Sequence, residues 1–345
     1  MNGPRQSGKR HSRGAGLRMP RCFYCVFFPR LASQPVKNWR AAAGQRMAEA
    51  MMILIAGCGY LGRQVALSLP ARGCRVLGVT RSAETAAALE AEGIACRAGD
   101  VGDAAWVASL PKADAVVHCA ASGRGGGAGA YRRVYAEGCR HLLAAQPQAR
   151  MVFASSTSVY AQADGSWVTE ESPAEPERET GRILREAEES VLAAGGAVLR
   201  LAGLYGPGRS VLLKNFLQGA AQIDVRTEPP ATPDGRWVNQ IHRDDAAAAL
   251  VRALLEPLRG IFNVADDMPL TQREIYTRLA ARFARPLPPE GPPALDRKRG
   301  WTHKRVSAAR LRATGWAPRF PSWFDALDHD AELVPSVLGQ AAQGI

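Results

Sequence analysis

MILIAGCGYLG, residues 52–62, is the stretch of sequence that decides the fold of this chain. Five apolar residues, typical of a buried strand, precede glycines at positions 57, 59 and 62. Strand, tight turn and helix in this order predict a phosphate-binding turn. Gly57 allows the turn, Gly59 lets the backbone approach a pyrophosphate, and Gly62 lets the helix pack closely on the strand. The N-terminus of that helix offers free N–H groups to the phosphates.

The composition indicates a globular protein with one large or two small domains. The chain has 345 residues, of which 46% are hydrophobic, and no run of about 18 apolar residues that would predict a membrane span. The net charge is +12, but residues 1–50 contain ten of the 44 basic residues and one of the 32 acidic residues, which accounts for +9. The remainder is nearly balanced in charge, so no nucleic-acid partner is predicted.

Residues 1–50 show no helical or strand periodicity. Their one apolar stretch, residues 22–28, is too short to span a membrane and marginal for the core of a signal peptide. Three interpretations remain open: a disordered basic tail, a transit-like peptide, or an extension upstream of a true start at Met47, Met51 or Met52. We favour the last, because the predicted strand begins immediately at Met52.

The cysteines predict neither a disulfide framework nor a metal site. There are seven at irregular spacing, and most have apolar neighbours typical of small core residues. Cys22 and Cys25 form a C-x-x-C pair, but no second pair follows at the spacing of a zinc site, so we interpret it as incidental. A reducing cytoplasm is the simplest compartment for such a chain.

From residue 52 onwards, strand and helix patterns alternate. This rhythm predicts an α/β protein with a doubly wound parallel sheet, the Rossmann fold. A mobile glycine-rich loop is expected at 122–129. The predicted strands cover 52–56, 75–80, 94–97, 114–119, 150–154 and 197–201, and the predicted helices after the first cover 84–92, 131–145 and 180–194.

The domain boundaries are expected where the alternation of strands and helices becomes irregular. We expect a dinucleotide-binding core over 51–205 and a tail over 331–345. Between them, a small interleaved region over 206–330 forms the substrate side and returns 238–241 and 261–264 to the sheet. A packed C-terminal cap is expected from the aromatic residues Trp316, Phe320, Trp323 and Phe324.

The choice of nucleotide depends on the end of the second predicted strand. NAD sites usually place an acidic residue there, about 20 residues after the first glycine, on the ribose 2′-hydroxyl. Here the sequence is Val-Thr-Arg-Ser at 79–82, and Arg81 suits a 2′-phosphate. NADP is therefore favoured over NAD, with a solvated arginine as the alternative. Asp100, after the third strand, is predicted to contact the adenine side or to cap a helix.

Several further segments extend the match beyond the glycine turn. With that turn, they resemble the extended short-chain dehydrogenase/reductase family, which includes NAD-dependent epimerases and dehydratases, from Met52 to about Phe320. The segments are Gly99-Asp100, 118–121 (HCAA), 155–160 (SSTSVY), 199–208 (LRLAGLYGPG), 241–245 (IHRDD), 262–264 (FNV) and 314–316 (TGW). Residue by residue, the resemblance and the glycine pattern imply a cofactor site of Gly57, Gly59, Tyr60, Leu61, Gly62, Arg81, Asp100, Ala120, Ala121, Ser155 and Tyr205.

The same resemblance fails at the catalytic residues. In such enzymes a tyrosine acts as acid or base, a lysine four residues later lowers its pKa and holds the nicotinamide ribose, and a serine polarises the substrate. Ser156 occupies the serine position, but Thr180 stands for the tyrosine and Leu184 for the lysine. A threonine hydroxyl cannot replace a phenol near neutral pH. The pattern resembles the atypical, YeeZ-like branch, which implies dinucleotide binding beside a degenerate active site.

Replacements for the missing groups lie nearby in the sequence. Arg182 and Arg185 are candidates for binding a ribose or an anionic substrate, and Glu179 or Tyr160 for acid–base chemistry. The favoured alternatives are a solvated helix face for the arginines, together with Glu186, Glu188 and Glu189, and simple packing for Tyr160. His242 is expected to be structural.

Two functions of different class therefore remain. One is an NAD(P)-dependent oxidoreductase or epimerase-like enzyme with reassigned catalytic residues and an unknown small-molecule substrate. The other is a non-catalytic dinucleotide-binding sensor or interaction protein. The missing tyrosine and lysine favour the second, whereas the nearly complete cofactor frame supports the first. Formation of a homodimer is left open.

Overall fold

The structure is a computed structural model that describes residues 50–123, 127–293 and 301–342. The basic N-terminal segment, with Cys22 and Cys25, lies outside the described residues. The same is true of residues 124–126, in the middle of the glycine-rich segment predicted to be mobile.

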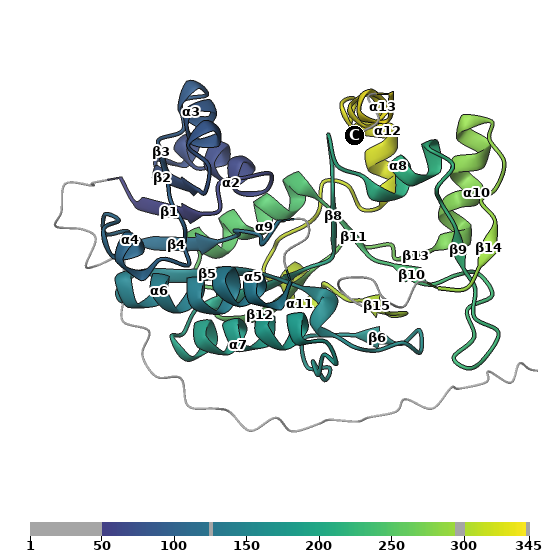
Figure 1. Cartoon of the computed structure of the whole chain (residues 1–345), viewed down its shortest axis with the longest axis horizontal. Coiled ribbons are helices and arrows are strands. Elements are labelled where there is room, and N and C mark those ends of the chain that lie inside the picture. Colours follow the sequence, from purple (N-terminus) through teal and green to yellow (C-terminus); the bar gives the residue numbers. More distant parts are fainter. Residues whose placement is uncertain (1–49, 124–126, 294–300, 343–345) are drawn as a thin grey trace, which may run out of the picture. The chain divides into compact units, whose positions relative to one another are not determined.

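Seven parallel strands form the main sheet (Figure 1). Their order is β12-β7-β5-β4-β1-β2-β3. β1 pairs with β2 on one side and with β4 on the other, so successive crossovers diverge from β1, as in doubly wound dinucleotide-binding sheets. The predicted fold class is confirmed. The strands are β1 (Met52–Ala56), β2 (Arg75–Thr80), β3 (Cys96–Ala98), β4 (Ala115–His118), β5 (Arg150–Ser156), β7 (Ala197–Leu201) and β12 (Gly260–Val264).

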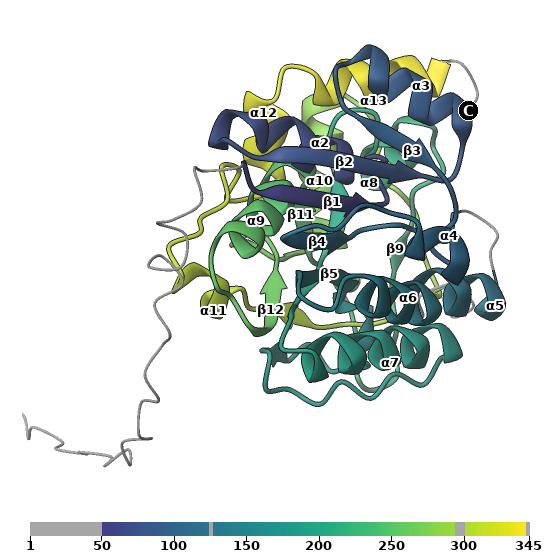
Figure 2. The same ribbon diagram turned by 90° about the vertical axis from the view of Figure 1, so that its left-hand side faces the viewer.

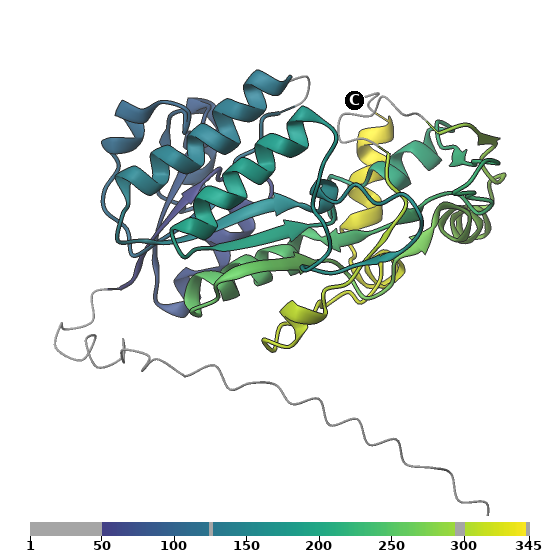
Figure 3. The same ribbon diagram turned by 90° about the horizontal axis from the view of Figure 1, so that it is seen from below.

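Helices cover both faces of this sheet. On one face, α2 (Gly62–Ser68) packs against α9 (Arg243–Leu255) (Figure 2). On the other, α6 (Gly138–Ala145) lies beside α7 (Glu179–Ala193) (Figure 3). Because the central strands are buried on both faces, they are apolar throughout rather than alternating. Short helices complete the connections: η2 (Pro70–Arg72), α3 (Ala83–Ala91), α4 (Ala104–Ala108) and η4 (Thr157–Val159).

The helix predicted over 131–145 is interrupted. It consists of α5 (Ala128–Tyr131), a π-helical segment η3 (Arg132–Glu137) and α6. A π-helical turn contains one residue more than an α-helical turn, and the hydrophobic pattern of the sequence does not reveal it. Such segments are frequent at functional sites, and this one borders the cavity described below.

Beyond β7 the chain forms two-stranded sheets rather than extending the main one. β8 (Gly203–Tyr205) pairs with β11 (Gln240–His242), so the prediction that 238–241 return to the main sheet was wrong, whereas β12 does join it. At the start of β8, the Gly203 N–H donates to the Asn239 carbonyl. The other pairs are β6 (Trp167–Val168) with β15 (Arg305–Val306), β9 (Ile223–Asp224) with β14 (Glu290–Gly291), and β10 (Trp237–Val238) with β13 (Leu270–Thr271).

A second hydrophobic core lies in this region, which follows the carboxyl end of β7 (Figure 1). The aromatic cap is divided: Trp316 packs into the core of the main sheet, whereas Phe320 and Trp323 belong to the second core. No break occurs at residue 331, since Leu333 is fully buried and α13 contacts α8. The remaining helices are α8 (Val211–Leu217), α10 (Gln272–Phe283), α11 (Ala309–Arg312), α12 (Trp323–His329) and α13 (Leu333–Ala342).

Within the described ranges, no helix is both long and apolar enough to cross a membrane.

Candidate functional site

The glycine turn has the geometry that its sequence predicts. Gly57 adopts φ +99°, and a Cβ on it would lie 2.1 Å from the Ala120 nitrogen, so no other residue fits without strain. A Cβ on Gly62 would lie 2.3 Å from the Gly57 carbonyl oxygen, which explains the close contact of α2 with the turn. At Gly59 the corresponding position has no atom within 4 Å. Gly59 therefore leaves space where a pyrophosphate would approach.

A cavity of about 400 Å³ opens over this turn, at the carboxyl ends of the parallel strands. This is where doubly wound sheets bind their ligands, and the volume lies in the range of small-molecule sites. Of the predicted cofactor residues, nine line the cavity: Gly57, Gly59, Tyr60, Leu61, Arg81, Asp100, Ala120, Ala121 and Ser155.

Gly62 and Tyr205 are not among the lining residues. Gly62 packs beneath the turn, and Tyr205 is 1% exposed, with its ring edge-on to His242 and Trp323 in the second core. Successive residues of a strand point to opposite sides, so on β8 Leu204 faces the cavity and Tyr205 does not. Leu204, rather than the predicted Tyr205, therefore lines the cavity.

Charged groups gather at one end of the cavity, after β2 and β3. Asp100 accepts a hydrogen bond from the Gly102 N–H at 2.8 Å and pairs with the Arg133 Nε at 3.0 Å. Partial burial alone would raise the pKa of Asp100, but the two hydrogen bonds and the positive charges of Arg133 and Arg81 together lower it. Arg81 is exposed and lines this end of the cavity, where its positive charge also helps to lower the pKa of Asp100. The helix cap nearby is Asp103, not Asp100.

Several lining residues were missed by the sequence analysis. Arg133, Val134 and Tyr135 come from η3, where the π-helical turn sets their direction. Arg209 follows β8 and stacks on the Tyr60 ring at 5.3 Å, while Arg243 stacks on the same ring at 5.2 Å. Arg209 lines the cavity and Arg243 does not. No local pattern marks these residues, because segments distant in sequence bring them to the turn.

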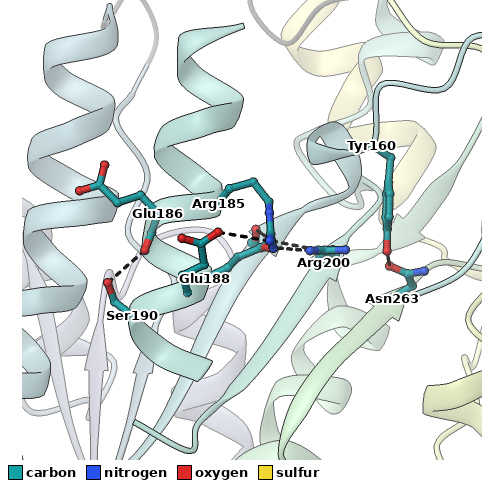
Figure 4. A network of polar contacts seen from close by, with 9 residues as sticks. Tyr160, Arg185, Glu186, Glu188, Ser190, Arg200 and Asn263 are labelled. Carbon is teal, nitrogen blue, oxygen red and sulfur yellow. Dashed lines mark hydrogen bonds and ion pairs between the residues drawn. The ribbon is translucent and has the colours of Figure 1, made fainter. Parts of the chain in front are cut away.

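A buried ion-pair network joins α7 and β7 (Figure 4), and Ser155, which lines the cavity, donates a hydrogen bond to it. Glu188 of α7 is 0% exposed and accepts hydrogen bonds from Ser155 Oγ at 2.6 Å, from Arg200 Nη2 at 2.6 Å and from Arg185 Nη1 at 2.5 Å. The favoured interpretation of this face as solvated was therefore wrong for Glu188. Burial opposes the charge of Arg200, but its hydrogen bonds with Glu188 and their attraction outweigh it and raise the pKa of Arg200.

Tyr160 lies on the far side of the same network (Figure 4). It is fully buried, its ring lies 4.8 Å from the Arg200 guanidinium, and its hydroxyl donates to Asn263 Oδ1 at 2.9 Å. Burial is the largest cause of the raised pKa of Tyr160. Tyr160 thus packs at the strand end, as the favoured interpretation expected, with its hydroxyl bound to Asn263.

The three residues at the usual catalytic positions are not brought together at the cavity. Ser156 Oγ accepts from the Ser158 N–H at 3.2 Å, and Ser156 does not line the cavity. Leu184 is 3% exposed in the main core. Thr180 instead borders a second cavity of about 330 Å³, together with Ser158, Tyr160 and Arg178.

His242 lies outside the lining of this cavity. His242 is fully buried, caps α9 by accepting from the Asp244 N–H, and lies 3.0 Å from Asp330 Oδ2, so it has structural partners. Within the described residues, no group of three His, Cys, Asp or Glu side chains could hold a metal ion.

Comparison with known proteins identifies relatives of this architecture. The family model described as "NAD dependent epimerase/dehydratase family" matches residues 53–265. Protein YeeZ of Escherichia coli (strain K12) is 31% identical over 278 residues, which cover 75% of this chain and 92% of that protein. A Streptomyces protein named 3-diazoavenalumate denitrifying reductase is 30% identical over 232 residues, or 64% of this chain and 70% of its own length.

Solved structures share the fold. UDP-glucose 4-epimerase of Thermus thermophilus, in complex with NAD, superimposes with a TM-score of 0.68 over 84% of this chain and 99% of that one, at 22% identity. The match of the family model across the main sheet, together with the glycine turn and its cavity, settles the classification: the chain belongs to the NAD-dependent epimerase/dehydratase family, whose members bind NAD(P).

Proposed function

We propose that this protein is an NADP-dependent oxidoreductase or epimerase-like enzyme whose catalytic residues differ from the Tyr-x-x-x-Lys pair. The observation that supports it best is the arrangement of Arg81 with the glycine turn. Gly59, which has no atom within 4 Å of its Cβ position, and the exposed Arg81 line the same cavity, so a pyrophosphate at the first and a 2′-phosphate at the second could belong to one ligand.

The residues present fit a dinucleotide along the whole cavity. The backbone at Gly57 and Gly59 would hold the pyrophosphate and Arg81 the 2′-phosphate, while Asp100 would face the adenosine. Asp100 would repel a 2′-phosphate if it were unpaired, but its ion pair with Arg133 balances that charge. When bound, the nicotinamide supplies or accepts a hydride. The relative named as a reductase supports redox chemistry.

A non-catalytic role, as a dinucleotide sensor or interaction protein, remains the second candidate. The specific observation in its favour is the buried aliphatic Leu184 at the position of the lysine. Without that lysine and the tyrosine before it, the ordinary proton donor is missing. Tyr160 does not replace it, because its hydroxyl is already bound to Asn263.

Calorimetric titration with NADPH and NADH tests the cofactor. We expect NADPH to bind at least about 10-fold more tightly, as one charge-assisted contact predicts. Arg81→Ala should remove that preference. The matched control is Arg75→Ala, which removes an exposed arginine at the opposite end of β2. Equal affinity for both cofactors, or a preference that survives in Arg81→Ala, would show that the NADP assignment is wrong.

Single-turnover hydride transfer separates the two functions. The NADPH complex is mixed with a panel of carbonyl compounds and sugar nucleotides, and the loss of NADPH absorbance is followed. Oxidation with any of them supports an enzyme. Tight binding without oxidation across the panel favours the sensor.

A further inference from the structure

We propose that Ser336 of the C-terminal helix α13 is a positioning residue for the cofactor site. It holds the turn at 206–209 and thereby keeps the Arg209 guanidinium at the cavity. The proposal rests on the proposed dinucleotide binding and goes beyond it, because it gives a part in ligand binding to a helix of which no described residue lines the cavity.

The turn at 206–209 joins β8 to α8 and is closed by two hydrogen bonds. The Gly206 N–H donates to the Arg209 carbonyl, and the Arg209 N–H donates to the Gly206 carbonyl, both at 2.9 Å. Pro207 in the second position and Gly208 with φ +72° in the third are typical of a type II turn. The hydrogen bonds within the turn do not use the Gly208 N–H, so another segment can hold the turn by this group.

Ser336 supplies the acceptor for this N–H. Its Oγ accepts from the Gly208 N–H at 2.7 Å and donates its one proton to the Leu333 carbonyl at 2.9 Å. Leu333 and Val337, on either side of Ser336, are fully buried in the second core, and α13 packs against α8 (Figure 1). A packed helix therefore fixes the hydroxyl, although 128 residues separate it from Gly208.

Arg209 directly follows the residue that Ser336 holds. Its guanidinium lies 5.3 Å from the ring of Tyr60, which belongs to the glycine turn, and both residues line the cavity. Glycine has no side chain to restrict its backbone, so a contact at Gly208 limits how far the chain before Arg209 can rotate. Loss of the Ser336 hydroxyl should therefore let the guanidinium move away from the phosphates of a bound dinucleotide.

Ser336→Ala tests this by calorimetric titration with NADPH. We expect the variant to bind NADPH about 3- to 10-fold more weakly than the unchanged protein, as the loss of one hydrogen bond predicts. Ser336→Thr retains the hydroxyl and should bind within about threefold of the unchanged protein. The matched control is Ser190→Ala, which removes a helical serine hydroxyl that donates to the Glu186 carbonyl and should leave affinity unchanged.

A double variant separates positioning of Arg209 from a general loss of packing. In an Arg209→Ala background, Ser336→Ala should change NADPH affinity by less than about twofold, because the residue it positions is absent. Unaltered NADPH binding by folded Ser336→Ala, equal losses in the Ala and Thr variants, or the same loss with and without Arg209 overturns the proposal. Failure of the unchanged protein to bind NADPH or NADH refutes the proposed function instead.

Discussion

Glu188 and Arg200 form a bidentate ion pair that is closed to water: their side chains are 0% and 1% exposed, and Nη2 lies 2.6 Å from Oε2. The pair joins α7 to β7, and the Ser155 hydroxyl donates a hydrogen bond to the same carboxylate. Burial removes the hydration of both charged groups, so each is stabilised by its ion pair with the other. The pair therefore fixes how α7 lies against the sheet at the point where the usual tyrosine and lysine are missing.

Removal of one partner of this pair should destabilise the fold strongly. Glu188→Ala leaves Arg200 charged and buried, and should cost about 3–5 kcal/mol in the free energy of unfolding, measured by urea denaturation. Glu189→Ala, next along the helix, removes a carboxylate whose side chain is 67% exposed and should cost no more than about 0.5 kcal/mol. Similar losses in the two variants would contradict the importance of the buried pair.

Alanine substitutions at Gly57 and Gly59 should have different effects: the first should lower stability and the second should lower NADPH affinity. Gly57→Ala forces a Cβ into the Ala120 backbone at a left-handed φ, and should cost about 2 kcal/mol or more of stability. Gly59→Ala meets no protein atom within 4 Å, so the fold should be retained. Its methyl group would instead occupy the space at the pyrophosphate and lower the NADPH affinity by about 10-fold or more. Urea midpoints and NADPH titration report these effects, and unchanged binding by Gly59→Ala would count against the site.

Arg209 and Arg243 stack on the same tyrosine ring but should differ in ligand binding. Arg209 lines the cavity beside the glycine turn, whereas Arg243 pairs with Asp244 outside it. Arg209→Ala should weaken NADPH binding about 10-fold through loss of a charge near the phosphates, and high salt should reduce the difference. Arg243→Ala is the matched control, with a change below about threefold on the same scale. A larger loss of NADPH affinity in Arg243→Ala than in Arg209→Ala would contradict the assignment of Arg209 to the binding site.

Lys304 should make stability depend on pH. It is 3% exposed, its Nζ donates to the Tyr160 carbonyl at 2.7 Å, and burial, followed by repulsion from Arg236, lowers its pKa from 10.5 to about 7. Between these values the unfolded chain holds a proton that the folded chain has released. The free energy of unfolding should therefore rise with pH across this window, by up to about 1.4 kcal/mol per pH unit.

Lys304→Met isolates this contribution, because it removes the amine and leaves the other titrating groups in place. The variant should be more stable than the unchanged protein at pH 7, and its advantage should shrink as the pH rises towards 10. Urea denaturation of both proteins at several pH values measures the difference. A difference that does not vary with pH would show that Lys304 is charged throughout.

The sequence alone determined the fold class and the ligand end of the sheet. An apolar run followed by glycines at positions 57, 59 and 62 is a local pattern, and each glycine has a backbone reason that does not depend on distant residues. The strands of the main sheet were predictable for the same reason, since burial on both faces leaves continuous apolar runs. The absence of the tyrosine and lysine at 180 and 184 could also be read directly.

Only the tertiary structure decided which side chains meet. On α7, the run of charged residues from Arg185 to Glu189 looks solvated in sequence, because its buried partners come from β5 and β7. The direction of each strand residue depends on how the strand is paired, so Leu204 rather than Tyr205 reaches the cavity. A local pattern fixes the backbone turn, but the burial of a charge depends on residues that only the folded chain brings together.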